Sequence, residues 1–393
     1  MKFKEIADSL EIKSYPAELD RIFEDPNFPK PNVCDEVLIS RLQDEFQTFG
    51  DCYDEVVAAA RLLAEDPVRL AWAQTVAAYD LSVDLAEARK VLCPPTDGSL
   101  LGNMLPLFAL IPMIPVSIAE YRRRGFSEDV VRNSAAAYGK CMRNVERNAG
   151  YLGLNQLYFT WLCIYAKARI YLIADYNFEI KKFPAWVYCL KNRENGDITF
   201  VAAKSMIHRN GNVLGSGGCT DPEGSFEANF QETDECYIGY PVENIRFVNK
   251  LVTYPKELWE CILRPNDDVL NLHIPSGVDL TPSCVANSVQ IGMDAAKKFY
   301  SEIPINILMC SSWLLDPVLE DFLGENSKIA MFGKMFHRFP IGSGGRAGFQ
   351  FIFPGKYEDE RTLPENTRLQ RAVKNHFLNG GHILSYGGIY MDK

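Results

Sequence analysis

The sequence predicts an α+β protein in which an all-helical N-terminal domain precedes a mixed-sheet α/β domain. From about residue 35 to residue 174, apolar residues recur at helical spacing, and after residue 174 short strand-like runs replace them. The pair Asn195-Gly196 is a strong hairpin signal, and a strand–loop–helix unit follows residue 267. A chain of 393 residues fits two or three domains. We therefore expect a helical domain at residues 1–175 and an α/β domain at residues 176–393.

Helical spacing in the first half is clearest at Val56, Ala60 and Leu63, where three apolar residues share one helix face. Ser127 has the chemistry of an N-cap, and the helix that it starts runs to about residue 148 before Gly150 ends it. The apolar and aromatic stretch 157–173 predicts a further, buried helix.

The second half begins with an antiparallel meander and then becomes α/β. Its expected meander strands are 178–180, 186–188, 197–203 and 225–230. Thr281 is the expected N-cap of a helix to residue 299, with Pro282 at the first helical position, where its missing N–H costs nothing. The other α/β elements are expected as strands 269–275, 305–310, 348–353 and 382–390 and helices 316–323, 327–336 and 368–377.

Charge and targeting signals narrow the functional class. With 41 Lys and Arg against 51 Asp and Glu, the net charge is −10, which opposes nucleic-acid binding because such proteins need a basic surface. The run Arg122-Arg123-Arg124 before Gly125 fits a helix C-terminus. The N-terminus has no apolar signal segment, and three prolines in residues 100–119 favour a buried helix over a membrane span. We expect a cytoplasmic protein with no membrane partner.

The metal-ligating residue types are dispersed. Eleven cysteines lie far apart with no CxxC pair, as expected for free thiols in a reducing compartment. The five histidines are also scattered, and none forms an HxxxH motif beside a carboxylate. No metal site is therefore expected.

The strand–loop–helix unit is the first candidate for chemistry. A loop that feeds a helix directs free backbone N–H groups and the positive end of the helix dipole at one point, which suits a phosphate or carboxylate. Ser276, Gly277, Thr281 and Ser283 are small or hydroxylated and would let an anion approach. The same pattern is also common in ordinary α/β connections, so this interpretation has a plain structural alternative.

Two strand ends supply candidate catalytic residues. His273, just before that loop, could act as a general base or could be a hydrogen-bonded core histidine. Ser312 and Cys310 end the next strand, where ligands bind in open α/β sheets. Ser312 is a candidate proton donor or a hydroxyl bonded to nearby backbone. Cys310 is a candidate nucleophile, which would make the protein a cysteine hydrolase, or a buried apolar residue.

Two glycine-rich stretches, 211–218 and 342–348, lack the P-loop pattern. The first fits a hairpin tip, and the second could place Arg346 near a ligand.

These residues together resemble a two-domain bacterial family with a helical N-acyltransferase-type N-terminal domain and a GNAT-like C-terminal domain. The resemblance covers most of the chain and rests on Leu272-His273-Ile274-Pro275-x-Gly277, Leu280, Ser288, Phe299, Cys310-x-Ser312-Trp313-Leu314-Leu315-x-Pro317, Ser327-x-Ile329 and Phe332. It implies a mixed-sheet GNAT-like fold and an acyl-CoA or acetyl-CoA cosubstrate. The loop after the fourth strand would bind the pyrophosphate, which corresponds here to Ser276, Gly277, Leu280, Thr281 and Ser283.

The resemblance implies direct acyl transfer from the thioester to an amine of a small-molecule acceptor, with no metal. His273 would be the base or an orienting group, and Ser312 the proton donor. The loop lacks the Gln/Arg-x-x-Gly-x-Gly/Ala pattern of the family. A non-catalytic ligand-binding or interaction protein with a degenerate GNAT-like fold is therefore the alternative hypothesis. The acceptor, the acyl-chain length and the oligomeric state are not specified by the sequence.

Overall fold

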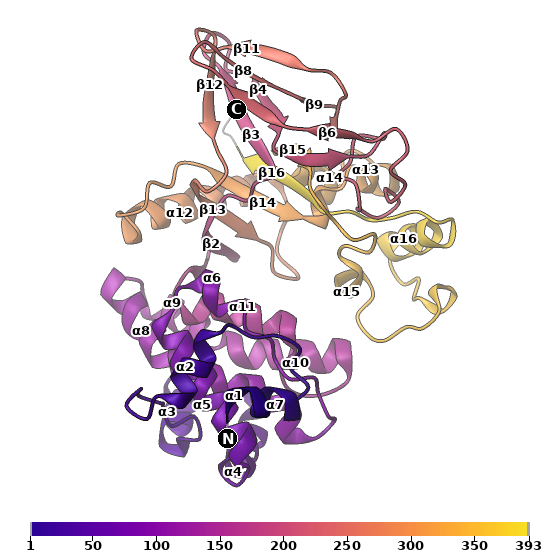
Figure 1. Cartoon of the computed structure of the whole chain (residues 1–393). Coiled ribbons are helices and arrows are strands. Elements are labelled where there is room, and N and C mark those ends of the chain that lie inside the picture. Colours follow the sequence, from indigo (N-terminus) through magenta and orange to yellow (C-terminus); the bar gives the residue numbers. More distant parts are fainter. Residues whose placement is uncertain (1, 391–393) are drawn as a thin grey trace. The chain divides into compact units, whose positions relative to one another are not determined.

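The computed structural model describes residues 2–390 and divides the chain into two compact units (Figure 1). The first unit ends at Leu172 and the second begins at Ile173, three residues before the boundary expected from the sequence. The first unit is helical and the second contains a mixed sheet with helices, so the predicted fold class is confirmed.

The helical unit is built from short and medium helices. They are α1 (Phe3–Ser9), α2 (Glu18–Glu24), α3 (Glu36–Phe46), α4 (Tyr53–Ala64), α5 (Pro67–Ser82), α6 (Leu85–Ala88), α7 (Leu100–Leu110), α8 (Met113–Arg124), α9 (Glu128–Ala135), α10 (Ala137–Ala149) and α11 (Gln156–Ala166). The Ser127 hydroxyl accepts from the Val130 amide, as an N-cap should, and Gly150 ends α10 in the left-handed conformation. The single helix expected between these caps is interrupted at Ala136, giving α9 and α10.

One helical stretch of the described chain, Leu100–Arg124, is long and apolar enough to cross a membrane. However, 78% of its most apolar window is buried inside the unit. Nearly all of α7 is buried, including Asn103 and Pro106. The stretch therefore has the environment of core helices, and the three arginines at its end precede the left-handed Gly125 as expected.

Asp80, near the end of α5, is a fully buried carboxyl group. It is 0% exposed, and neither carboxyl oxygen has a hydrogen-bond partner among residues 2–390. The Lys167 ammonium lies close by, but it bonds the backbone carbonyls of Asp80 and Val83, capping the helix C-terminus. Burial raises the pKa of Asp80 well above its ordinary value, although the charge of Lys167 opposes the shift. Burial therefore favours the protonated, neutral form of this carboxyl group.

Replacing Asp80 by Asn should remove a pH dependence of stability. Because the pKa of Asp80 is raised in the folded state, the unfolded chain releases this proton at lower pH, and wild-type stability falls as pH rises. Asp80→Asn should lack this contribution, whereas Asp129→Asn, an exposed substitution in α9, should retain it. Urea unfolding at acidic, neutral and alkaline pH measures the slopes. Equal slopes for wild type and Asp80→Asn would refute a buried neutral carboxyl group.

The described strands from β2 onward and five α-helices lie in the second unit, and β1 crosses the boundary between the units. The strands are β1 (Ile170–Ile173), β2 (Tyr176–Lys182), β3 (Val187–Asn192), β4 (Ile198–Ala202), β5 (Ser205–Ile207), β6 (Phe226–Ala228), β7 (Phe230–Glu232), β8 (Cys236–Gly239), β9 (Val242–Glu243), β10 (Arg246–Phe247), β11 (Val252–Pro255), β12 (Trp259–Leu263), β13 (Asp268–His273), β14 (Leu308–Ser312), β15 (Phe336–Pro340) and β16 (Tyr386–Tyr390). The helices of the second unit are α12 (Pro282–Phe299), α13 (Val318–Leu323), α14 (Lys328–Lys334), α15 (Phe349–Ile352) and α16 (Arg368–Leu378).

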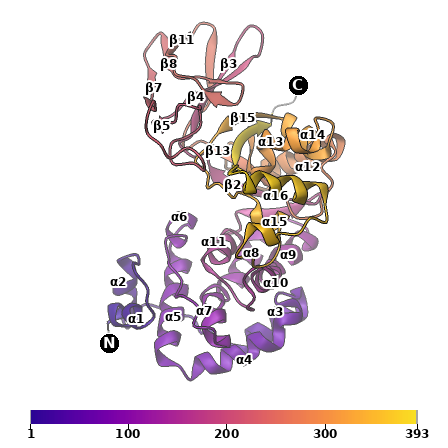
Figure 2. The same ribbon diagram turned by 90° about the vertical axis from the view of Figure 1, so that its right-hand side faces the viewer.

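A six-stranded mixed sheet in the order β1-β2-β13-β14-β16-β15 forms the centre of this unit. The strands β13 and β14 are parallel, and α12 makes the crossover between them. Figure 2 shows α12, α13 and α14 grouped beside the central strands. Gly292 lets α12 pack closely on the sheet, because a Cβ at this position would lie 2.3 Å from the Phe178 ring.

The segment between β2 and β13 folds into small antiparallel sheets that stand apart from the helices (Figure 2). The hairpin expected at Asn195-Gly196 is confirmed by the pairing of β3 with β4. Apolar residues of β3 and β4 share one core with the central sheet, including Val187, Phe200, Val269 and Met309. This inserted segment therefore covers one face of the central sheet, while α12 packs against Phe178 on the other.

Two elements near the C-terminus differ from the sequence prediction. The alternating run at 348–353 was expected to be a strand, but Phe349–Ile352 is a helical turn. The rings of Phe349 and Phe353 lie 5.3 Å apart, and Phe349 also packs against Phe377 of α16. Tertiary packing of the aromatic residues thus overrides the local alternation. The edge strand β15 begins where the predicted helix 327–336 was expected to end.

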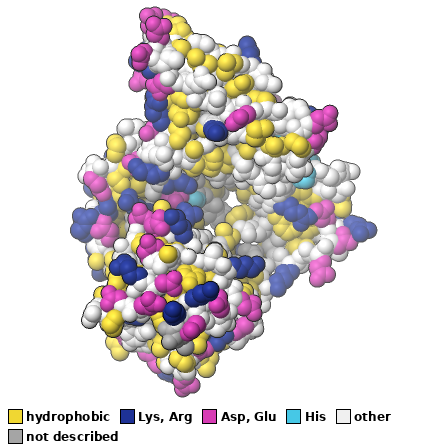
Figure 3. Space-filling model, in the orientation of Figure 1, with side chains coloured by type: hydrophobic (Ala, Val, Ile, Leu, Met, Phe, Trp, Pro, Cys, Tyr) yellow, Lys and Arg dark blue, Asp and Glu magenta, His cyan; other side chains and the backbone are white. Residues whose placement is uncertain are grey.

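Surface charge is mixed on the visible face of the molecule. Figure 3 shows Lys and Arg side chains interspersed with Asp and Glu side chains rather than gathered in one field. Many of these charges form pairs, such as Arg61 with Glu36 and Arg264 with Glu232. Exposed pairs of this kind contribute little to stability.

Candidate active site

The two parallel strands in the middle of the sheet separate before either strand ends. The ladder between β13 and β14 includes Leu270 to Leu272 and stops at the pair Leu272–Cys310. By contrast, β13 stays paired with β2 through His273, and β14 stays paired with β16 through Ser312. The sheet is therefore open between its two central strands at their carboxyl ends, where ligands bind in α/β sheets.

A histidine–carboxylate pair stands at one side of this opening. Nε2 of His273 lies 2.8 Å from Oε2 of Glu179, which is on the adjacent strand β2. The Asn271 amide donates to the same carboxylate oxygen at 3.1 Å. Glu179 is 2% exposed whereas the His273 side chain is 27% exposed, so a buried carboxylate supports an imidazole that solvent can reach.

The electrostatics of the pair assign the proton on the imidazole. Burial raises the pKa of Glu179, but the hydrogen bond from His273, the charge of Lys181 and the Asn271 amide outweigh it and hold the pKa at about 2. The carboxylate is thus ionised and can only accept hydrogen bonds. A distance of 2.8 Å to an ionised carboxylate requires Nε2 of His273 to act as the donor, and Nδ2 of Asn271 lies 2.9 Å from the same nitrogen.

A second feature of the pair is an unsatisfied acceptor. Oδ1 of Asn271 is buried and has no hydrogen-bond partner within residues 2–390. A buried amide oxygen of this kind normally binds a donor from protein, ligand or water. It therefore fits a ligand N–H group or an ordered water beneath His273.

Glu179→Gln should remove an acid-dependent loss of stability. Since the pKa of Glu179 falls from 4.5 to about 2 on folding, its ionised form stabilises the protein at neutral pH. The shift corresponds to roughly 3 kcal/mol. This contribution is complete above pH 4.5 and is lost as the pH falls toward 2. Denaturant unfolding across this interval should show a smaller pH dependence for Glu179→Gln than for wild type.

The matched control for this experiment is Glu227→Gln. Glu227 is an exposed residue of β6 whose side chain makes no hydrogen bond or ion pair within the described chain. Its substitution should leave the wild-type pH dependence unchanged. If Glu179→Gln and Glu227→Gln gave the same profile, the coupling between Glu179 and His273 would be refuted.

Ser312 ends the neighbouring strand β14, but the structure does not bring its hydroxyl together with His273. Side chains alternate between sheet faces along a strand, and the Leu272–Cys310 pair puts Ser312 on the face opposite His273. Its hydroxyl oxygen accepts from the Leu314 amide at 3.1 Å, which starts the short 3-10 turn Trp313–Leu315. The Ser312 hydroxyl is therefore bonded to nearby backbone, which is the second of the two roles that the sequence left open.

The loop from β13 to α12, where the sequence predicts an anion site, has free space around Gly277. Gly277 has φ +85°, and a Cβ there would meet no atom within 4 Å. Ser276 and Ser283 are exposed, while Leu280 and Thr281 are half-buried. Thr281 precedes the first helical residue Pro282 as expected, although its side chain forms no capping hydrogen bond.

The first turn of α12 leaves donors available. Within the described chain, the amides of Ser283 and Cys284 donate to no acceptor, and Pro282 has no N–H group. The Lys328 ammonium adds a positive charge at this corner, since it binds the Asp279 carboxylate at 2.8 Å. The hydrogen bond from Lys328 and that from the Thr281 amide lower the pKa of Asp279 to about 2. An incoming anion would therefore meet two free amides and one lysine, but also a competing carboxylate.

The remaining candidates from the sequence have structural roles. Cys310 is 0% exposed, and burial raises the pKa of its thiol, which disfavours a nucleophilic thiolate. The two glycine-rich stretches contact each other, because the Gly217 amide donates to the Ser343 carbonyl at 3.0 Å. Arg346 pairs with Glu360 and lies over the Phe349 ring, so its charge is already used.

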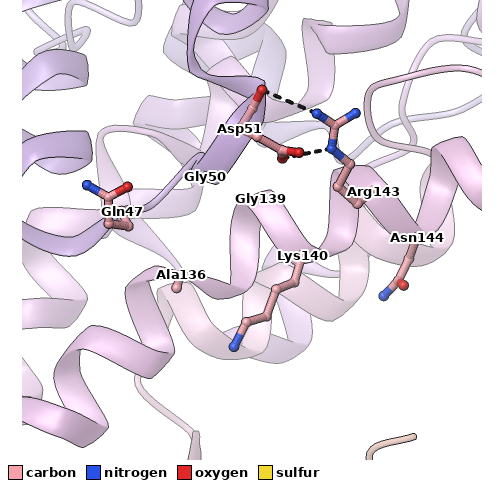
Figure 4. A pocket seen from close by; sticks show the side chains of 8 residues that line it. All are labelled: Gln47, Gly50, Asp51, Ala136, Gly139, Lys140, Arg143 and Asn144. Atoms are coloured by element: carbon pink, nitrogen blue, oxygen red, sulfur yellow. Dashed lines mark hydrogen bonds and ion pairs between the residues drawn. The ribbon is translucent and has the colours of Figure 1, made fainter.

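The helical unit also contains a shallow pocket (Figure 4). It has a volume of about 450 Å³ and is lined by Gln47, Gly50, Asp51, Ala136, Gly139, Lys140, Arg143 and Asn144. The Arg143 guanidinium binds Asp51 at 2.8 Å and Glu146 at 2.6 Å, so its charge is neutralised. The pocket therefore presents no convergent set of reactive groups, and no cluster of His, Cys, Asp or Glu among residues 2–390 could hold a metal ion.

Comparison with known proteins identifies the family. Residues 39–167 match the N-acyltransferase N-terminal domain and residues 188–390 match the GNAT-like C-terminal domain. The chain therefore belongs to the two-domain family of N-acyltransferases with a GNAT-like C-terminal domain, as the sequence motifs indicated. A search of curated proteins found no match.

Solved structures of acyltransferases share the fold over the full length. An acyltransferase mutant in complex with octanoyl-CoA is 15% identical with a TM-score of 0.67, and the alignment covers 100% of both chains. An acyltransferase in complex with CoA and 10C-teicoplanin is 16% identical with a TM-score of 0.68, and the alignment covers 99% of both chains. A third structure, in complex with decanoyl-CoA and teicoplanin, has 16% identity, a TM-score of 0.66 and the same coverage.

Sequence reasoning missed Glu179 and Asn271. Glu179 lies 94 residues before His273 and also outside both matched domains. The available signal was a charged residue between Phe178 and Ile180, two apolar residues of a predicted strand. A carboxylate in that position indicates a buried partner, but the sequence does not say which residue it is.

Proposed function

We propose that this protein is an acyl-CoA-dependent N-acyltransferase that transfers an acyl group directly to an amine of a small-molecule acceptor. The observation that carries the proposal is the opening between β13 and β14 with the Glu179–His273 pair at its edge. Family membership supports the reaction class. The acyl-CoA and CoA bound by the three acyltransferases support the cosubstrate.

The residues present fit an acyl-CoA molecule at two places. The pairing of β13 with β14 ends at Leu272–Cys310, so the carboxyl ends of the two strands leave a place where an extended, amide-containing chain can lie. The free amides of Ser283 and Cys284 and the Lys328 ammonium suit a phosphate group. We infer that Ser276, Gly277, Leu280, Thr281 and Ser283 form the loop around that phosphate.

The thioester supplies the activated acyl group, and the protein supplies proton transfer. The neutral amine attacks the thioester carbonyl, an N–C bond forms, and the C–S bond breaks with its electron pair going to sulfur. Nδ1 of His273 takes the proton lost by the amine, while Nε2–H stays bonded to Glu179. The ionised Glu179 stabilises the imidazolium that results.

The acceptor belongs to the same proposal. Teicoplanin, present in two of the structures that share the fold, is a glycopeptide. We propose a small molecule that carries an amine, the acceptor group of N-acyl transfer, and that His273 takes the proton that this amine loses. We place the reaction in the cytoplasm, where the eleven free cysteines of the described chain would stay reduced.

A non-catalytic binding protein is the second candidate function. It is favoured by Asp279, whose carboxylate lies at the α12 corner and accepts from the Thr281 amide at 3.1 Å. A carboxylate at that position would repel the pyrophosphate of CoA. Under this alternative the chain would keep the fold without binding acyl-CoA.

Acyl-CoA should stabilise the full-length protein. A ligand at about 100 times its dissociation constant stabilises a folded protein by about 2.7 kcal/mol. Thermal unfolding with acetyl-CoA and octanoyl-CoA should therefore show a higher melting temperature. Lys328→Ala should weaken the shift because it removes the cation at the α12 corner, whereas Lys334→Ala on the same helix should not. An unchanged melting temperature with every acyl-CoA would favour the binding-protein alternative.

His273→Gln should reduce acyl transfer by roughly 100-fold or more, because it removes the general base. The measurement is release of CoA thiol with an amine acceptor drawn from a panel, after the variant is shown to melt like wild type. His337→Gln is the control, since β15 lies three strands from β13 in the sheet. Wild-type rates for His273→Gln would exclude His273 as the base.

A further inference from the structure

Tyr176, the first residue of β2, binds the loop that joins β13 to α12. Its side chain is 2% exposed, and its hydroxyl donates to the Asp279 carbonyl oxygen at 2.8 Å. The strand β2 is antiparallel to β13, and Asn177 pairs with His273, so Tyr176 lies where β13 ends. A buried residue of the neighbouring strand therefore reaches the loop that we assign to the phosphate of acyl-CoA.

The rest of this loop has few hydrogen bonds to hold it. In residues 275–280, the Asp279 carbonyl is the one main-chain group that bonds any other part of the described chain. The Asp279 side chain is held separately, because its carboxylate accepts from Lys328 at 2.8 Å and from the Thr281 amide at 3.1 Å. The loop is therefore fixed at a single residue, and Tyr176 connects that residue to the central sheet.

The backbone just before Tyr176 has an uncommon conformation. Ala174 and Asp175 have φ +46° and +69°, in the left-handed region that costs free energy for residues other than glycine. Such residues persist where the surrounding structure fixes the backbone, and they concentrate at functional sites. The turn that they form starts β2 at Tyr176. Two costly backbone positions thus precede the residue that holds the loop.

The Tyr176 hydroxyl remains a donor, and its ring lies on the α12 side of the sheet. Burial raises the pKa of Tyr176 to about 12, and the charge of Asp279 adds to the shift, so the hydroxyl is protonated at neutral pH. Tyr176 and Phe178 share one face of β2, and Phe178 lies against α12 at Gly292. This face is opposite the one that carries His273.

We propose that Tyr176 is a positioning residue for acyl-CoA. By fixing the Asp279 carbonyl, its hydroxyl holds the free amides of Ser283 and Cys284 at the start of α12 in place for a phosphate group. The inference rests on the proposed function and adds to it a residue that acts through the loop. Tyr176 should therefore affect the binding of a phosphate-bearing donor and leave the chemical step unchanged.

The test compares two acyl donors with the same thioester, octanoyl-CoA and octanoyl-pantetheine, of which the second has no phosphate. In Tyr176→Phe, the KM for octanoyl-CoA should rise by about 3- to 10-fold with kcat unchanged, since one hydrogen bond contributes about this much. The kcat/KM for octanoyl-pantetheine should stay at the wild-type value. Tyr357→Phe is the matched control, because the Tyr357 hydroxyl donates to the Pro354 carbonyl in an exposed segment.

Two further measurements need no amine acceptor. Titration calorimetry should show CoA binding weakened by the same factor in Tyr176→Phe and unchanged in Tyr357→Phe. Hydrogen exchange of the ligand-free protein follows the loop itself, because the Val285 amide bonds the Thr281 carbonyl at 3.0 Å and closes the first turn of α12. This amide should exchange faster in Tyr176→Phe than in wild type or Tyr357→Phe.

The outcomes separate this inference from the proposed function. An unchanged KM for octanoyl-CoA, or unchanged exchange of Val285, would overturn the role of Tyr176 while wild type still binds CoA. A lower kcat, an equal loss with octanoyl-pantetheine, or the same effects in Tyr357→Phe would also overturn it, because they indicate a general effect on folding. If wild type does not bind CoA, the proposed function itself fails.

Discussion

The separation of β13 from β14 is the constraint on which the candidate site depends. Each strand remains paired on its outer side, so the opening is held rigidly by β2 and β16 rather than by a flexible loop. The crossover helix α12 starts at the same end of the sheet, which puts its free first-turn amides near the strand ends. One backbone feature thus brings the opening between the strands, the first turn of α12 and the Glu179–His273 pair to the same end of the sheet.

The Glu179–His273 pair adds the electrostatic part of the site. A carboxylate that is 2% exposed stays ionised because the hydrogen bonds from His273 and Asn271, together with Lys181, outweigh the cost of burial. The ionised carboxylate orients the imidazole by accepting from Nε2. Oε2 of Glu179 accepts both hydrogen bonds. One atom of β2 therefore holds the Asn271 amide and the imidazole that would take part in proton transfer.

The sequence predicted local elements better than their contacts. The Thr281-Pro282 start of α12 and the Asn195-Gly196 hairpin were predictable because their signals lie within a few residues. The helical turn at Phe349 was not, since packing on Phe377 decides it. The sheet face on which Ser312 lies depends on strand register, which a sequence does not state. Glu179 was missed because its partner is 94 residues away.

The position of the inserted sheets allows their loops to vary in sequence without disturbing the Glu179–His273 pair. The chain leaves the central sheet after β2, builds β3 to β12, and re-enters it at β13, so the two halves of the Glu179–His273 pair flank the whole insertion. Their contact is made through adjacent strands of the core and does not pass through the inserted loops. Loop tips in that segment are consequently free to diverge in length and composition while the Glu179–His273 pair stays in register.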